Sequence, residues 1–169
     1  MLFSGLSLIL FPHFLYTEEK RKEQTMRIFI DADGCPVVKL TVSYARKNGI
    51  PVTIVKNYAH VIEDDYAEII TVDISSDAAD YYIANKIRKE DILITQDYGL
   101  AAMALSKGAR ILNQNGLFIH NDNIMTLLDR RHINQKMRKN SRVYTKIPKR
   151  TPDDDESFLF SLKKLVGSP

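Results

Sequence analysis

Aspartates that directly follow separate apolar segments are the residues of this chain best suited to chemistry. An open parallel α/β sheet binds ligands outside the carboxyl ends of its strands, and each of these aspartates follows a predicted strand. Carboxylates brought together at that edge repel one another, so a cluster of them needs a cation or shared protons. Oxygen ligands without cysteines or a histidine pair favour Mg²⁺ or Mn²⁺ over zinc. The candidate metal ligands are Asp31, Asp33, Asp77, Asp80 and Asp97.

Phosphodiester hydrolysis is the chemistry that such a site favours. A metal held by a few carboxylates can polarise a phosphoryl oxygen and lower the pKa of a bound water enough to attack phosphorus. Each carboxylate also has a purely structural explanation as a turn residue, a helix cap or a partner of the helix dipole. We favour a shared site, because independent caps have no reason to gather at one edge. The catalytic candidates are Asp31, Asp77, Asp80 and Asp97.

Smaller polar residues lie beside these carboxylates and could orient them. We expect this role for Ser76, Thr95 and Asn113, with capping or loop structure as the alternative. Cys35 lies at a predicted helix start, where the dipole would lower its thiol pKa. No histidine is near it in the sequence, so a small packing residue is the preferred interpretation over a nucleophile.

A basic segment lies in the second half of the chain. Arg130 to Arg150 contains nine Lys or Arg and no Asp or Glu, although the whole chain has a net charge of only +3. Basic residues interleaved with Tyr144 are typical of a surface that follows a phosphate backbone, so we expect RNA as a partner. A solvated loop is the alternative. The candidate nucleic-acid contacts are Arg130, Arg131, Lys136, Arg138, Lys139 and Arg142.

Most of the predicted strands that must position these residues are separated by predicted helices. Short apolar, β-branched runs predict strands over the ranges 27–30, 50–55, 68–74, 92–95 and 109–112. Helices are predicted from Pro36 to about Asn48 and over 78–88, 100–107, 122–131 and 157–165. Strands joined through helices predict an α/β fold with a mainly parallel sheet.

The chain of 169 residues suits one domain, with 44% hydrophobic and 27% charged residues. We expect residues 1–25 to be a non-core extension, as an upstream start assignment would produce, and an interfacial membrane anchor is the alternative. The apolar run from Leu2 to Tyr16 is too short to span a bilayer, so no stable membrane insertion is expected. Residues 26–169 form the predicted domain, with a basic loop at 132–152 and a C-terminal helix. The single cysteine fits a reducing compartment, hence the cytoplasm.

Four stretches resemble the bacterial YaiI/YqxD family: FIDADGCP (29–36), SDAADYYIA (76–84), ITQDYGLA (94–101) and LNQNG (112–116). The resemblance runs from about Met26 to the C-terminus, with the motifs in the same order and spacing. That family is similar to PIN domains, which implies a PIN-like, Rossmann-like three-layer sandwich and an acidic metal site used by ribonucleases.

The resemblance also implies roles for individual residues. Asp31 would be the acid that ends the first strand, Asp77 or Asp80 the mid-domain acid, and Asp97 the acid of the T-x-D element. Asn113 stands where a fourth acid would be expected, which departs from a two-metal pattern.

Three functions follow from these observations. The first is a Mg²⁺- or Mn²⁺-dependent nuclease acting on RNA. The second is a non-catalytic, metal-stabilised RNA-binding or regulatory module. The third is a phosphatase that forms an aspartyl phosphate on Asp31, as the Asp31-x-Asp33 spacing suggests. That class of phosphatase has a hydroxyl residue where Cys35-Pro36 stands.

Overall fold

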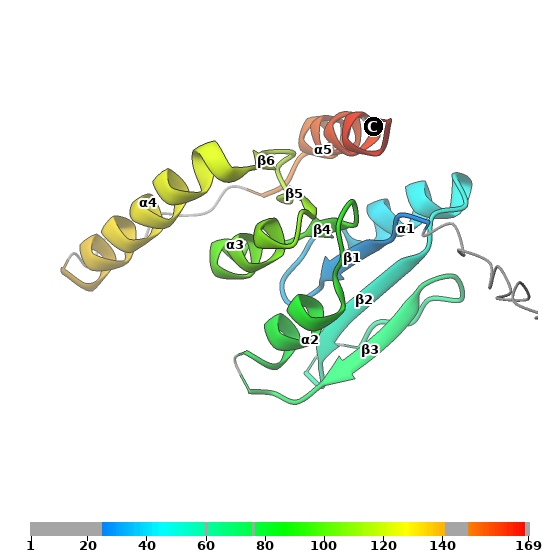
Figure 1. Cartoon of the computed structure of the whole chain (residues 1–169), viewed down its shortest axis with the longest axis horizontal. Coiled ribbons are helices and arrows are strands. Elements are labelled where there is room, and N and C mark those ends of the chain that lie inside the picture. The colour runs from blue at the N-terminus through cyan, green and yellow to red at the C-terminus, as the bar shows by residue number, and fades with distance from the viewer. Residues whose placement is uncertain (1–24, 60, 76, 141–148, 168–169) are drawn as a thin grey trace, which may run out of the picture.

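The computed structural model describes residues 25–59, 61–75, 77–140 and 149–167, with 134–140 described by their backbone only. Within these residues, six strands form one sheet in the order β3-β2-β1-β4-β5-β6 (Figure 1). The first five are parallel, and β6 is antiparallel to β5. The strands are β1 (Ile28–Asp31), β2 (Val52–Asn57), β3 (Glu68–Val72), β4 (Ile92–Ile94), β5 (Arg110–Leu112) and β6 (Phe118–Ile119).

Helices cover both faces of the sheet and make three layers. The helices are α1 (Val38–Lys47), α2 (Ala78–Lys86), α3 (Tyr98–Ser106), α4 (Asn121–Asn140) and α5 (Pro152–Gly167). One core cluster joins Ile28 and Ile30 to α1 and α5, and the other joins Phe29 to α2 and α3. This alternation along β1 follows from the two-residue period of a strand, and it explains why the central strands are apolar on both faces. The predicted α/β sandwich with a mainly parallel sheet is confirmed.

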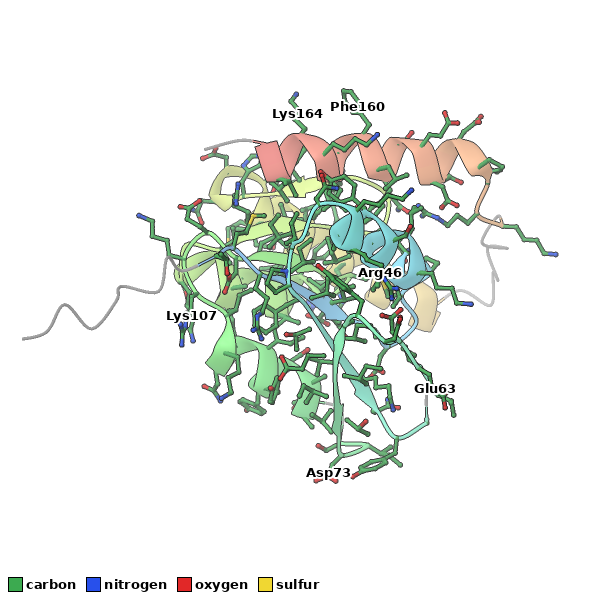
Figure 2. The ribbon with its side chains drawn as sticks, turned by 90° about the vertical axis from the view of Figure 1, so that its right-hand side faces the viewer. Arg46, Glu63, Asp73, Lys107, Phe160 and Lys164 are labelled. Atoms are coloured by element: carbon green, nitrogen blue, oxygen red, sulfur yellow. The ribbon has the colours of Figure 1, made fainter. Side chains whose placement is uncertain are left out.

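The C-terminal helix begins earlier than the sequence pattern predicts, at Pro152 instead of residue 157. Thr151 and Asp154 cap it reciprocally: the Thr151 amide donates to Asp154 Oδ2 (2.8 Å), and the Asp154 amide donates to Thr151 Oγ1 (3.3 Å). On the outer side of this helix, Phe160 faces away from the sheet (Figure 2) and is 68% exposed.

The expected basic loop at 132–152 is partly wrong, because α4 continues to Asn140. Neither proline nor glycine interrupts residues 121–140, and Leu, Met, Arg, Lys and Gln are good helix formers, so nothing stops the helix at Arg131. Residues 141–148 of that loop, and residues 1–24 of the predicted extension, lie outside the described part of the chain. None of the described helices combines the length and apolar character needed to cross a bilayer.

Candidate acidic site

The central crevice of the sheet lies between β1 and β4, which are neighbours although α1, β2, β3 and α2 separate them in sequence. The chain leaves β1 toward α1 on one face and leaves β4 toward α3 on the other face. The loops therefore diverge at the carboxyl ends of these two strands, which is where open α/β sheets bind ligands. A cavity of about 530 Å³ opens there, and Asp31, Asp33, Asp80, Asp97 and Arg131 are in its lining.

Asp31 is the last residue of β1, and its hydrogen-bond partner is Thr95, the residue that follows β4. Thr95, only 1% exposed, donates its hydroxyl to Asp31 Oδ2 at 2.8 Å. The Asp97 amide donates to the same hydroxyl oxygen at 3.0 Å, so the hydroxyl proton is directed to Asp31. Burial raises the pKa of Asp31, the charges of Asp33 and Asp97 raise it further, and the Thr95 hydrogen bond partly opposes the rise. The orienting role predicted for Thr95 would act through this hydrogen bond.

The two carboxylate oxygens of Asp97 have different roles: Oδ1 caps a helix, and Oδ2 belongs to the acidic site. As the N-cap of α3, it accepts hydrogen bonds at Oδ1 from the Gly99 amide (2.6 Å) and the Leu100 amide (3.1 Å). Its Oδ2 accepts from Arg131 Nη1 at 2.9 Å. Burial would raise the pKa of Asp97, but the Arg131 and backbone hydrogen bonds lower it overall. A side chain at position 99 would collide with Oδ1, since its Cβ would lie 2.9 Å away.

Asp80 lies in the first turn of α2 and faces the same cavity. Its pKa is raised to about 6, first by burial and then by the negative charges of Asp97, Asp31 and Asp77, against which Arg131 acts. The ionised form of Asp80 is therefore disfavoured by carboxylates that come from β1 and from the loop after β4.

Asp77 does not line the cavity, contrary to the prediction that placed it beside Asp80 as a ligand. It is the exposed N-cap residue of α2 and makes no side-chain capping hydrogen bond. Because α2 begins at Ala78, Asp77 lies outside the first turn while Asp80 lies within it. The effect of Asp77 on the site is electrostatic: its negative charge raises the pKa of Asp80.

Asp33 lines the cavity but uses its carboxylate to hold β2. The Asn57 amide donates to Asp33 Oδ1 (3.2 Å), and Asn57 Nδ2 donates to Asp33 Oδ2 (2.8 Å). Asn113 is also used structurally, since its Oδ1 accepts the amides of Asn115 and Leu117 (both 2.9 Å) in the β5–β6 turn. The predicted orienting role of Asn113 is therefore replaced by a turn role. Ser76 lies outside the described residues.

The donor chemistry suits a hard divalent cation, but the present side-chain positions do not complete a site. Among the described residues, no three Asp, Glu, His or Cys side chains are placed to hold a metal ion together. The carboxylates are partly engaged: Asp97 Oδ2 pairs with Arg131, and Asp33 binds Asn57. For Asp97 Oδ2 to hold a cation, Asp97 would have to give up its bond to Arg131.

The sequence does not show that Arg131 belongs to the acidic site, because the basic segment around it predicts only a contact with nucleic acid. Its partner Asp97 lies 34 positions away, and only the packing of α4 against α3 brings the two together. Arg130 and Arg131 are exposed on α4. The side chains of Lys136, Arg138 and Lys139, and all of Arg142, lie outside the description.

Two other residues have structural roles. Arg150, at the end of the basic segment, donates to the Gln114 carbonyl oxygen (2.8 Å) and to the Asp154 carbonyl oxygen (3.0 Å), which ties α5 to the loop after β5. Burial raises the pKa of the Cys35 thiol to about 11, with a smaller contribution from the charge of Asp31. Cys35 is therefore a protonated packing residue at neutral pH.

Comparison with known proteins gives a consistent family match. Residues 29–168 match the family model described as "Uncharacterized BCR, YaiI/YqxD family". The "UPF0178 protein" of Alkaliphilus oremlandii is 52% identical over 133 residues, covering 79% of this chain and 86% of that protein. The protein of the same name from Natranaerobius thermophilus is 45% identical over 141 residues, covering 83% of this chain and 96% of that protein. No solved structure matches.

Proposed function

The chain belongs to the YaiI/YqxD family of uncharacterised bacterial proteins, and from its acidic cavity we propose that it is a divalent-metal-dependent phosphodiesterase whose substrate is RNA. One observation carries this proposal. Asp31, Asp80 and Asp97 come from three separate elements and line one cavity at the β1/β4 crevice. Two of them, Asp31 and Asp80, have raised pKa values there.

The electrostatic cost of placing these carboxylates close together favours a functional explanation. Burying carboxylates beside one another destabilises a fold unless a cation or proton neutralises them. A helix cap accounts for Asp97, but it does not account for Asp31 or Asp80. Carboxylates whose pKa values are perturbed and which gather in a crevice are candidates for a functional site.

Asp31, Asp80 and Asp97 would hold the cation. When bound, a Mg²⁺ or Mn²⁺ ion would polarise a phosphoryl oxygen and neutralise charge that develops on it. Thr95 keeps the Asp31 carboxylate oriented toward the crevice through its hydroxyl. A bound cation would stabilise the ionised form of Asp80 and so lower its pKa, because the charged form then gains a partner.

Arg131 has a second task in this proposal. Its exposed guanidinium lies at the cavity and can donate paired hydrogen bonds to a phosphate. A phosphate that binds Arg131 would draw it from Asp97 and free that carboxylate for the cation. Substrate binding and cation binding would then support one another.

The proposal is tested with purified protein and short fluorescent RNAs, both single-stranded and structured, in the presence of Mn²⁺, Mg²⁺ or a chelator. We expect metal-dependent cleavage that is lost in Asp31→Asn and retained in Asp73→Asn. Asp73 is a suitable control because it is an exposed carboxylate after β3 that does not line the cavity (Figure 2). Intact RNA under every condition, or equal cleavage by Asp31→Asn, contradicts the proposal.

A non-catalytic RNA-binding module is the second candidate, favoured by the ion pair between Arg131 and Asp97. This pair already gives Asp97 a cation, at 2.9 Å. Such a protein would bind RNA with an affinity that falls steeply with salt and would show no metal-dependent cleavage. The same RNAs, followed by filter binding at several salt concentrations, distinguish the two candidates.

A further inference from the structure

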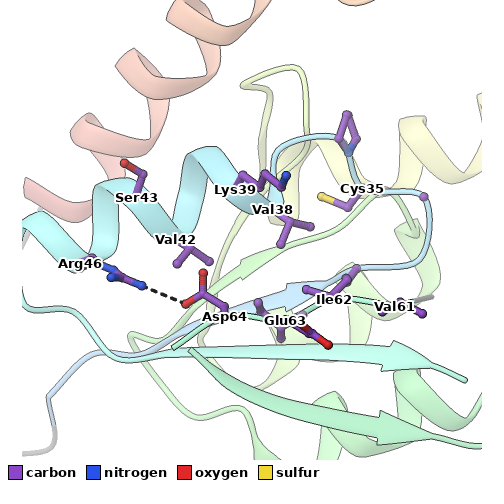
Figure 3. A pocket seen from close by; sticks show the side chains of 14 residues that line it. Cys35, Val38, Lys39, Val42, Ser43, Arg46, Val61, Ile62, Glu63 and Asp64 are labelled. Atoms are coloured by element: carbon purple, nitrogen blue, oxygen red, sulfur yellow. Dashed lines mark hydrogen bonds and ion pairs between the residues drawn. The ribbon is translucent and has the colours of Figure 1, made fainter. Parts of the chain in front are cut away.

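A second cavity of about 880 Å³ lies on the α1 side of the sheet, and we refer to it as the α1 pocket. Figure 3 shows it between α1 and residues 61–64. Its apolar surface includes Val42 and Ile54, which are 4% and 0% exposed, together with the partly buried Ile62. Lys39 and Glu63 add exposed charged groups to its lining. The volume and the mixture of apolar walls with a few polar groups are typical of small-molecule sites.

The outer wall of this pocket is held at Asp64. Arg46 donates to Asp64 Oδ1 (3.3 Å), which also accepts the amides of Tyr66 (2.8 Å) and Ala67 (3.0 Å). The bonds between Asn57 and Asp33 also hold the end of β2 to the loop after β1. Backbone that is already held by hydrogen bonds needs less ordering when a ligand binds.

The α1 pocket adjoins the acidic cavity. Gly34 lines both, and the same loop contributes Ala32 and Cys35 to the α1 pocket and Asp31 and Asp33 to the acidic cavity. Gly34 has φ +72° and no side chain, and a Cβ there would meet no atom within 4 Å, so open space borders the loop at this residue. The Gln96 side chain donates to the Gly34 carbonyl oxygen (3.1 Å), which fixes this loop to the loop after β4. A ligand that spans Gly34 would therefore contact both cavities.

We propose that the α1 pocket receives a nucleobase of the RNA strand whose phosphate lies in the acidic cavity. A nucleotide has the matching chemistry, since its anionic phosphate is joined through a sugar to a flat ring with apolar faces and a polar edge. The aliphatic side chains of Val42 and Ile62 would contact the ring faces, and Lys39 and Glu63 would meet the polar edge. This inference rests on the proposed function, because it assigns the phosphate to the acidic cavity.

The lining described for the α1 pocket contains no aromatic ring, so the base would not be stacked as it is on the aromatic platforms of single-strand binders. We therefore expect weak binding of an isolated nucleotide and only modest preference among the bases. The pocket would act mainly by placing the strand so that a defined phosphate faces Asp31 and Asp80.

The test is a set of NMR titrations of the full chain without metal. Adenosine and uridine 5′-monophosphates provide the base, and ribose 5-phosphate is the matched probe without one. We expect the nucleotides to shift amide signals of α1 and residues 61–64, while ribose 5-phosphate leaves those signals in place. Ser43→Tyr, at an exposed lining position, should weaken nucleotide binding at least about tenfold. Ser106→Tyr is the control, since Ser106 is exposed on α3 and lines neither cavity.

Two outcomes overturn the inference: no nucleotide-induced shifts around the α1 pocket, or the same shifts with ribose 5-phosphate. Equal weakening by Ser43→Tyr and Ser106→Tyr also overturns it. These titrations contain no metal and measure no cleavage, so they are independent of the RNA-cleavage test. Cleavage without base binding would refute this inference alone, and base binding without cleavage would refute the proposed function alone.

Discussion

Replacing Asp80 by asparagine should make the metal-free protein more stable at neutral pH. The pKa of Asp80 is raised from 3.8 to about 6, with burial the largest cause and neighbouring carboxylates the next. A raised pKa in the folded state means that folding favours the protonated carboxyl group. The ionised group therefore opposes folding above pH 6, and an asparagine amide of the same shape does not.

The magnitude follows from the size of this shift. Two pKa units correspond to about 3 kcal/mol if the whole shift acts on stability. Asp80 is only partly buried, so solvent screening reduces the figure, and we expect a gain of about 1–2 kcal/mol in the free energy of unfolding. For the same reason, wild-type stability attributable to this group should fall between about pH 4 and pH 6 and then level off.

Urea denaturation in the presence of a chelator measures this effect across the pH range. Asp80→Asn should exceed wild type at pH 7.5 and approach it near pH 4, while Asp73→Asn should follow wild type throughout. Adding Mn²⁺ at pH 7.5 should make wild type more stable than Asp80→Asn, because a ligand stabilises only the protein that binds it. If Asp80→Asn is no more stable than Asp73→Asn at pH 7.5, Asp80 is not held at an electrostatic cost and the reasoning is refuted.

Three further substitutions test other contacts. Gly116→Ala should lower the free energy of unfolding by about 1–3 kcal/mol in urea denaturation, because position 116 has φ +80° and its Cβ would lie 2.9 Å from a serine hydroxyl of α5; an unchanged urea midpoint would contradict this. Arg131→Gln should reduce the salt slope of RNA binding by about one in filter binding. It should also leave calorimetric Mn²⁺ affinity equal or higher, since Asp97 loses a competing cation, and a weaker Mn²⁺ affinity would contradict this. Thr95→Val should weaken Mn²⁺ binding by about tenfold in calorimetry, because the β1 carboxylate loses the hydroxyl that stabilises its charged form; unchanged affinity would show that the hydroxyl has no such role.

The sheet and its acidic edge are predictable from the sequence because their signals are local. Short β-branched runs predict the parallel strands, and the residue after each run must lie at the carboxyl edge. This is enough to assign Asp31 and Asp97 to the same edge, and the adjacency of β1 and β4 then brings them together. The same signals do not show whether Asp77 or Asp80 faces the cavity, because that depends on the residue at which α2 begins.

The remaining features depend on long-range packing or on very short elements. The pairing of Arg131 with Asp97 requires α4 to pack against α3, and no spacing in the sequence records that contact. The turn role of Asn113 follows from β6, a strand of two residues that is too short to produce a pattern. The predicted helix at 122–131 is shorter than α4 because a run of basic residues is also typical of a loop, although the helix propensity of those residues favours the structure found.

The most direct test of the acidic site is where Mn²⁺ binds, measured by the broadening of amide NMR signals at substoichiometric metal. We expect broadening to begin at the amides around Asp31, Asp80 and Asp97. The same amides should be broadened less in Asp80→Asn than in wild type at equal Mn²⁺. The first turn of α5 is an internal control for nonspecific binding of Mn²⁺ to carboxylates. It contains Asp153, Asp154 and Asp155, which do not line the cavity. Broadening that begins at α5, or that spreads evenly over the exposed carboxylates, would contradict a cation site in the β1/β4 crevice.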